Sequence, residues 1–201
     1  MENRYFDYLF KEIKNSNLHE HNEYYKFYLD EFNEIKFNEI IEKNIVVGLD
    51  YYIENELISE IINQNKKLNY ITFYTNKKTS GIYRKYDVIL FNKEIKHNIK
   101  RIQVYKGIHF PIYDCAIDSE TGEVKHLSKN YYNDENDLHY EFEYEMESGN
   151  LKCITVYDPY NYIDTSNHTI LPNQVGIGKN DYGFEWNKFE YYKNATPILP
   201  H

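Results

Sequence analysis

Carboxylates alternate with aromatic or apolar residues between His139 and Glu147, in the order His139-Tyr140-Glu141-Phe142-Glu143-Tyr144-Glu145-Met146-Glu147. Successive side chains of a β-strand point to opposite faces, so an extended segment would place all four glutamates on one face. Such a face attracts cations and repels nucleic acid. It is either an exposed or guarded edge strand, or a docking surface for a basic partner.

Tyrosines and further carboxylates flank this acidic strand. Tyrosine offers a large contact area with few rotatable bonds, so nearby tyrosines are candidate anchors for a partner. Residues 130–137 read as a polar, acidic loop of the kind that often carries function. The predicted partner-binding residues are Glu141, Glu143, Glu145, Glu147, Tyr131, Tyr132, Tyr140, Asp134, Glu135 and Asp137.

A second set of residues has the types needed for hydrolysis. Asp114 is followed, after a turn, by Glu123-Val124-Lys125. This pattern resembles the Asp…Glu-x-Lys motif of the restriction-endonuclease-like superfamily. The resemblance implies two carboxylates that hold Mg²⁺ and a lysine that assists the attacking water. The alternative is an ordinary hairpin, because Glu123 directly follows Gly122 and an acidic segment repels a phosphate backbone.

Other metal, cofactor and nucleophile signatures are missing from the sequence. His19 and His21 are two residues apart, so on a helix they would point to different sides and could not form a zinc site. Cys115 and Cys153 lie in strand-like runs and are expected to be buried, reduced thiols. We therefore expect no cofactor, no metal, no catalytic residue and no enzymatic activity.

Charge is separated along the chain. Residues 1–70 hold 8 basic and 14 acidic residues, residues 71–110 hold 9 and 2, and residues 111–201 hold 6 and 16. The basic stretch could bind single-stranded nucleic acid, but internal charge balance or a solvated surface is the favoured interpretation. Its cations are Lys77, Lys78, Arg84, Lys85, Lys93, Lys96, Lys100, Arg101 and Lys106.

Apolar residues in the first third follow a helical spacing. Three amphipathic helices are predicted, the last of which begins at Asp50. Their apolar stripes are Phe6, Leu9, Phe10 and Ile13; Tyr25, Tyr28, Leu29, Phe32 and Ile35; and Ile53, Leu57, Ile58 and Ile61.

From about residue 68 the apolar spacing changes to a period of two, which predicts strands joined by turns. The predicted strands are 68–75, 82–91, 99–105, 109–117, 123–127, 139–147, 151–157 and 184–192. The predicted fold class is α+β, with N-terminal amphipathic helices packed on a mostly antiparallel, meander-type β-sheet. We expect a single domain over residues 1–201, with a helical portion at 1–66 and an antiparallel β portion at 67–201.

These observations favour a binding protein. The N-terminus lacks the apolar run of a signal peptide and no segment is long enough to span a bilayer, so a cytoplasmic protein without a membrane partner is expected. Its segregated negative charge and its 23 tyrosines motivate this interpretation, and in general style the chain is similar to the immunity proteins that bacteria pair with secreted toxins. The leading hypothesis is an acidic inhibitor that occludes the active site of a cationic toxin or enzyme, and nucleic acid is not an expected partner. Two alternatives remain: a metal-dependent nuclease-like hydrolase that uses Asp114, Glu123 and Lys125, and a structural subunit of a larger assembly.

Overall fold

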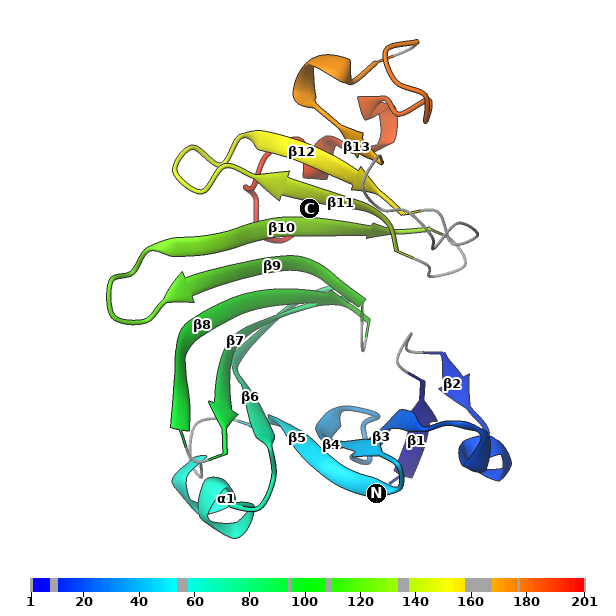
Figure 1. The fold of residues 1–201 in the computed structure, drawn as a ribbon, viewed down its shortest axis with the longest axis vertical. Coiled ribbons are helices and arrows are strands. Elements are labelled where there is room, and N and C mark those ends of the chain that lie inside the picture. The colour runs from blue at the N-terminus through cyan, green and yellow to red at the C-terminus, as the bar shows by residue number, and fades with distance from the viewer. Residues whose placement is uncertain are drawn as a thin grey trace. The chain divides into compact units, whose positions relative to one another are not determined.

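The computed structural model describes residues 2–7, 11–53, 58–93, 95–107, 110–133, 138–157, 168–176 and 178–200, and this part of the chain is mostly β-structure (Figure 1). The strands are β1 (Glu2–Phe6), β2 (Glu12–Ile13), β3 (Glu23–Leu29), β4 (Ile35–Glu42), β5 (Ile45–Tyr52), β6 (Tyr70–Ser80), β7 (Tyr83–Asn92), β8 (Ile95–Lys106), β9 (Phe110–Asp118), β10 (Val124–Tyr132), β11 (Leu138–Tyr144), β12 (Leu151–Val156) and β13 (Thr169–Ile170). The helical segments are α1 (Ile58–Gln64) and the 3-10 turns η1 (Asn15–Glu20), η3 (Pro172–Gln174), η4 (Trp186–Lys188) and η5 (Glu190–Tyr192).

These thirteen strands form one sheet in the order β13-β12-β11-β10-β9-β8-β7-β6-β5-β4-β3-β1-β2. Most neighbours are consecutive in the chain, so short turns suffice to join them. Lys43 and Asn44, between β4 and β5, have φ angles of 49° and 62°, as a two-residue hairpin turn requires. The pair β5 and β6 is parallel, and the connection between them contains α1.

The predicted α+β fold class, with N-terminal amphipathic helices over residues 1–66 packed on a sheet, is wrong, because the described residues are mostly β-structure. Residues 23–29 and 35–42 are strands β3 and β4, and α1 has only seven residues. In β3, Phe27 is buried on one face while Tyr28 is partly buried on the other. A strand with apolar side chains on both faces also matches a helical spacing, so spacing alone did not discriminate. Aromatic and β-branched residues favour strands, and here that preference prevailed.

The strands predicted from the sequence agree only in part with the structure. The antiparallel character of the sheet is confirmed, with predicted strands 109–117 and 151–157 close to β9 and β12. The predicted strand 184–192 is wrong, because that segment forms η4 and η5. The stripe residues Leu9, Phe10 and Leu57 lie outside the described residues, and the single domain stays a prediction.

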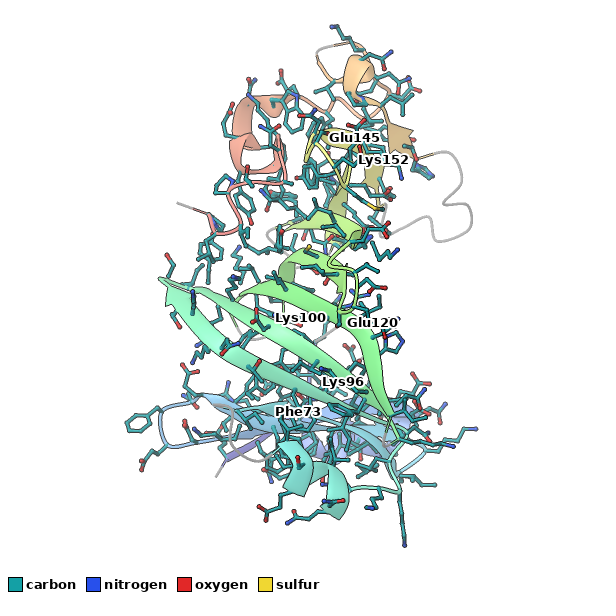
Figure 2. The ribbon with its side chains drawn as sticks, turned by 90° about the vertical axis from the view of Figure 1, so that its left-hand side faces the viewer. Phe73, Lys96, Lys100, Glu120, Glu145 and Lys152 are labelled. Atoms are coloured by element: carbon teal, nitrogen blue, oxygen red, sulfur yellow. The ribbon has the colours of Figure 1, made fainter. Side chains whose placement is uncertain are left out.

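The chain divides into two compact units. Unit 1 comprises residues 1–78 and 86–100, and unit 2 comprises residues 79–85 and 101–201. In unit 1, an aromatic ladder crosses four strands from Tyr28 to Phe37, Tyr51 and Phe73, with ring centroids 4.1, 5.5 and 6.0 Å apart. Phe73, which is fully buried, is labelled in Figure 2. Such cross-strand pairs stabilise sheets, and they account for part of the aromatic content.

In unit 2, the core lies on one face of β10, β11 and β12. Phe142 and Ile154 are fully buried there. The C-terminal segment, residues 184–199, packs on this face (Figure 1), with the Phe142 ring 4.6 Å from that of Tyr192 and 6.2 Å from that of Trp186. A segment that the sequence presented as a strand is therefore the cover of this core.

Candidate functional site: the polar face of unit 2

The strands β9 to β12 carry polar side chains on the face that is turned away from this core. Residues directly opposite each other on neighbouring strands point to the same side of a sheet. Ser128 lies opposite Asp114 and Glu143, and Glu143 in turn lies opposite Cys153. We call this surface the polar face; its residues are Asp114, Ser128, Asn130, Tyr132, Glu141, Glu143, Cys153, Thr155 and Tyr157.

Glu141 and Glu143 occupy the middle of the polar face. Glu141 accepts a hydrogen bond of 2.8 Å from the Tyr157 hydroxyl. The Lys152 ammonium lies 3.1 Å from a carboxylate oxygen of Glu143, which keeps 34% of its side chain exposed. One of these two carboxylates therefore has a lysine partner and the other a phenol. Both side chains remain partly exposed.

The phenols beside Glu141 respond to burial and to its charge. Burial, followed by the hydrogen bond to Glu141, raises the pKa of Tyr157. Burial also raises the pKa of Tyr132, and the charge of Glu141 adds to that effect. Both phenols therefore stay protonated over the physiological range and keep their capacity to donate hydrogen bonds.

Glu145 and Glu147 do not continue this face. Strand β11 ends at Tyr144, and the chain then turns, with the Gly149 amide bonded to the Glu145 carbonyl. Both glutamates are exposed, and Glu145 accepts a hydrogen bond of 2.6 Å from the Ser148 hydroxyl. Glu145, labelled in Figure 2, lies at the turn end of the β11–β12 hairpin, where its amide donates a hydrogen bond to the Asn150 carbonyl. Of the four alternating glutamates, Glu141 and Glu143 therefore lie on one face of a strand, whereas Glu145 and Glu147 lie in a turn.

The tyrosines predicted as anchors are divided between the two faces. Tyr140 is 8% exposed and packs in the core, 5.1 Å from the Phe184 ring. Tyr131 also faces the core, 4.9 Å from the Phe189 ring, so neither stands beside the carboxylates. Tyr132 lies near Glu141, whose charge acts on its phenol, and it also packs against the core of unit 2. Tyr157 lies on the polar face, although the sequence analysis did not name it as a site residue. Its position two residues after Thr155 on the same strand was the signal that could have placed it there.

Three of the predicted partner-binding residues, Asp134, Glu135 and Asp137, lie outside the described residues. The binding role of the whole set stays a prediction.

Asp114 belongs to a hydrogen-bonded group that extends the polar face onto β8. It forms an ion pair with Arg101 and accepts a hydrogen bond of 3.1 Å from Gln103. His126 Nε2 lies 3.0 Å from the Ser128 hydroxyl and 3.8 Å from Asp114. A serine-histidine-aspartate relay needs both ring nitrogens, one for each partner. Because a single nitrogen meets both partners here, the group does not have that geometry.

The structure does not bring Asp114 together with Glu123. Asp114 pairs across the strands with Ser128, whereas the Glu123 carbonyl accepts a hydrogen bond from the Asp118 amide. Asp114 and Asp118 are four positions apart along β9, which corresponds to about 13 Å. The exposed Glu123 carboxylate is instead 2.6 Å from the Lys125 ammonium. In the part of the chain that the structure describes, no three His, Cys, Asp or Glu side chains are grouped to hold a metal ion.

Among the described residues, the ion pairs found for the basic stretch involve carboxylates outside residues 141–147. Lys77 is 2.5 Å from Glu34 and Lys100 is 3.3 Å from Asp87, while Arg101 pairs with Asp114. These contacts support internal charge balance for part of this stretch. Glu141 instead accepts a hydrogen bond from the uncharged Tyr157 hydroxyl.

Lys129 is a fully buried lysine on the apolar side of β10. Its ammonium donates hydrogen bonds to the carbonyls of Tyr191, Asn194 and Pro197 at 2.6, 2.9 and 2.9 Å. Burial lowers the pKa of Lys129 to about 7, although the three hydrogen bonds to carbonyls stabilise the charged form and act in the opposite direction. The sequence analysis missed this residue, although Leu127 and Tyr131 at the same spacing place it on the apolar face. It attaches the C-terminal segment to the sheet.

Among the described residues, no helix has the length and apolar character needed to cross a bilayer. Comparison with protein families, with curated proteins and with solved structures found no match to this chain.

Proposed function

We propose that this protein is a non-enzymatic binding protein of the immunity type, which uses the polar face of unit 2 to occlude the active site of a basic toxin or enzyme. The proposal rests on one observation above all. Glu141 and Glu143 project side by side from β11 and stay partly exposed, and only Glu143 has a lysine within 4 Å among the ion pairs described.

The surroundings of the two carboxylates suit a cationic side chain from a partner. An arginine could replace the Lys152 contact at Glu143 and bind Glu141 at the same time, because its donors form a planar fork. Tyr132 and Tyr157 would supply aromatic contact beside that charge pair, as tyrosines do at the centre of many interfaces. The carboxylates would then occupy the positions that substrate phosphates take in a nucleic-acid-degrading enzyme.

Electrostatic attraction of this kind acts mainly on the rate of association. Complementary charges steer the encounter and are screened by salt, so association should slow as salt is added. The net charge of -9 contributes to this long-range attraction, and the paired glutamates determine where the partner docks.

The test compares two double variants of equal net charge. Glu141→Gln/Glu143→Gln removes the central carboxylates, and Glu12→Gln/Glu31→Gln removes two exposed ones from unit 1 as a matched control. Binding is measured for each against the purified product of the neighbouring reading frame, and against host lysate, at low and at high salt. We expect the first variant to bind at least about tenfold more weakly and the control to bind as the wild type does. Equal weakening by both variants, or no partner at either salt concentration, would contradict the proposal.

A further inference from the structure

Unit 1 contains a cavity that the proposed function does not use. Its volume is about 440 Å³, which lies within the range of small-molecule sites. Strands β4, β5, β6 and β7, helix α1 and the β3–β4 turn all contribute residues, and every lining residue belongs to unit 1. The cavity therefore does not depend on the placement of unit 2.

Three tyrosines form a rigid aromatic wall in this cavity. The rings of Tyr52 and Tyr74 are stacked, with centroids 4.5 Å apart and planes 8° apart. The Tyr86 ring meets both of them edge-on, at 5.6 and 5.7 Å. Because each ring is held by the other two, the wall is formed before any ligand arrives. Ile35, Ile53 and Ile61 complete the apolar lining.

Charged side chains of both signs line the rest of the cavity in matched pairs. The Lys77 ammonium lies 2.5 Å from Glu34, and the Lys36 ammonium lies 3.1 Å from Asp30. Asp30 is fixed further, because its carboxylate accepts hydrogen bonds from the amides of Phe32 and Glu34. Two carboxylates and two ammonium groups give these four residues a net charge of zero.

This arrangement restricts the chemistry of a ligand. An anion or a cation would have to separate an ion pair, and these four side chains offer no excess of either charge to offset that cost. A purely apolar molecule would cover the four charged groups without hydrogen-bonding to them, which is unfavourable. Hydroxyl groups avoid both costs, because they donate to a carboxylate or accept from an ammonium while the pair stays intact.

We propose that the cavity binds a neutral ring compound that carries several hydroxyl groups and one flat face, as a sugar or a nucleoside does. The flat face packs on the wall formed by Tyr52, Tyr74 and Tyr86. The hydroxyl groups contact the Glu34–Lys77 and Asp30–Lys36 pairs.

The test uses neutral probes and their charged counterparts, with ligand-observed NMR as the readout. N-acetylglucosamine is compared with its 6-phosphate, and uridine with its 5′-monophosphate. We expect one of the two neutral probes to bind, and we expect its phosphate to bind at least about tenfold more weakly. Which of the two neutral probes binds distinguishes a sugar site from a nucleoside site. Absence of binding by both neutral probes, or tighter binding of either phosphate, would overturn the proposal.

Two variants locate the site. Tyr74→Ala opens the aromatic wall and should weaken binding about tenfold or more, whereas Tyr182→Ala removes an exposed tyrosine of unit 2 and should not change it. Because Tyr74→Ala could also disturb the fold, Glu34→Gln/Lys77→Met removes one ion pair from partly exposed positions and keeps the net charge. This double variant should weaken binding of the neutral probe about tenfold. Unchanged binding in this double variant would place the ligand elsewhere.

Discussion

Replacement of Lys129 by methionine tests the attachment of the C-terminal segment. Methionine keeps much of the side-chain volume but cannot donate a hydrogen bond, so the carbonyls of Tyr191, Asn194 and Pro197 lose their common donor. A buried acceptor left without a partner costs about 1 to 3 kcal/mol. We take about 1 to 2 kcal/mol for each carbonyl, because the segment can shift toward water and because the variant no longer has to desolvate an ammonium group. The free energy of unfolding should fall by about 3 to 6 kcal/mol.

The single tryptophan reports directly on this change. Trp186 belongs to the C-terminal segment, and its ring lies 5.3 Å from that of Phe184. If the segment detaches, water reaches Trp186 and its emission moves to longer wavelength. Urea unfolding followed by Trp186 emission and by circular dichroism therefore separates local release from global unfolding.

Lys152→Met provides the matched control. Lys152 is 60% exposed and pairs with Glu143 at the surface, so its loss should cost less than about 1 kcal/mol. The reasoning about Lys129 is refuted if the free energy of unfolding of Lys129→Met lies within about 0.5 kcal/mol of the wild-type value and its tryptophan emission is unchanged.

The pH dependence of stability gives a second measurement on the same residue. The folded-state pKa of Lys129, about 7, lies below its ordinary value of 10.5. Between these values the unfolded chain carries a proton that the folded chain lacks, so the free energy of unfolding rises with pH. The rise is at most about 1.4 kcal/mol for each pH unit. It should be seen from about pH 7 to about pH 9, below the ordinary titration of tyrosine, and it should be absent from Lys129→Met.

Three further predictions concern other parts of the fold. Gly48→Ala places a Cβ 2.4 Å from the Tyr70 ring and should lower the free energy of unfolding by about 1 to 3 kcal/mol. Adding Tyr70→Ala to the same chain should remove that cost, so purely additive effects of the two changes in urea unfolding would argue against this clash. Phe73→Ala removes a fully buried ring and should lower the free energy of unfolding by about 3 to 5 kcal/mol, whereas the same change at Phe32, which is 78% exposed, should have little effect. Tyr157→Phe removes the donor to Glu141 and should cost about 1 kcal/mol in thermal unfolding, and a stabilised variant would show that this hydrogen bond is not favourable.

Several strands of the second half could be predicted from the sequence because they have one apolar and one polar face. In β11, for example, Tyr140, Phe142 and Tyr144 alternate with Glu141 and Glu143. The first third lacks this contrast. β3 has apolar side chains on both faces, so its spacing fitted a helix as well as a strand, and only the cross-strand aromatic contacts of the folded sheet distinguished the two.

The same alternation determined part of the candidate site. It placed Glu141 and Glu143 on one side of a strand, and it also implied that Tyr140 points to the opposite side. An alternation states which residues share a face, but it does not state which face is covered. The predicted role of Tyr140 as an anchor required its exposure, which no local pattern supplies.

The sequence by itself thus determined the alternating strands and the two carboxylates that stand together on β11. The tertiary structure decided which face of those strands is buried. The C-terminal segment covers the apolar side, and Lys129 bonds to carbonyls that follow it by 62 to 68 residues. The local pattern around Lys129 carries no information about contacts so distant in the chain, because they exist only once the sheet has formed and the segment has folded back on it.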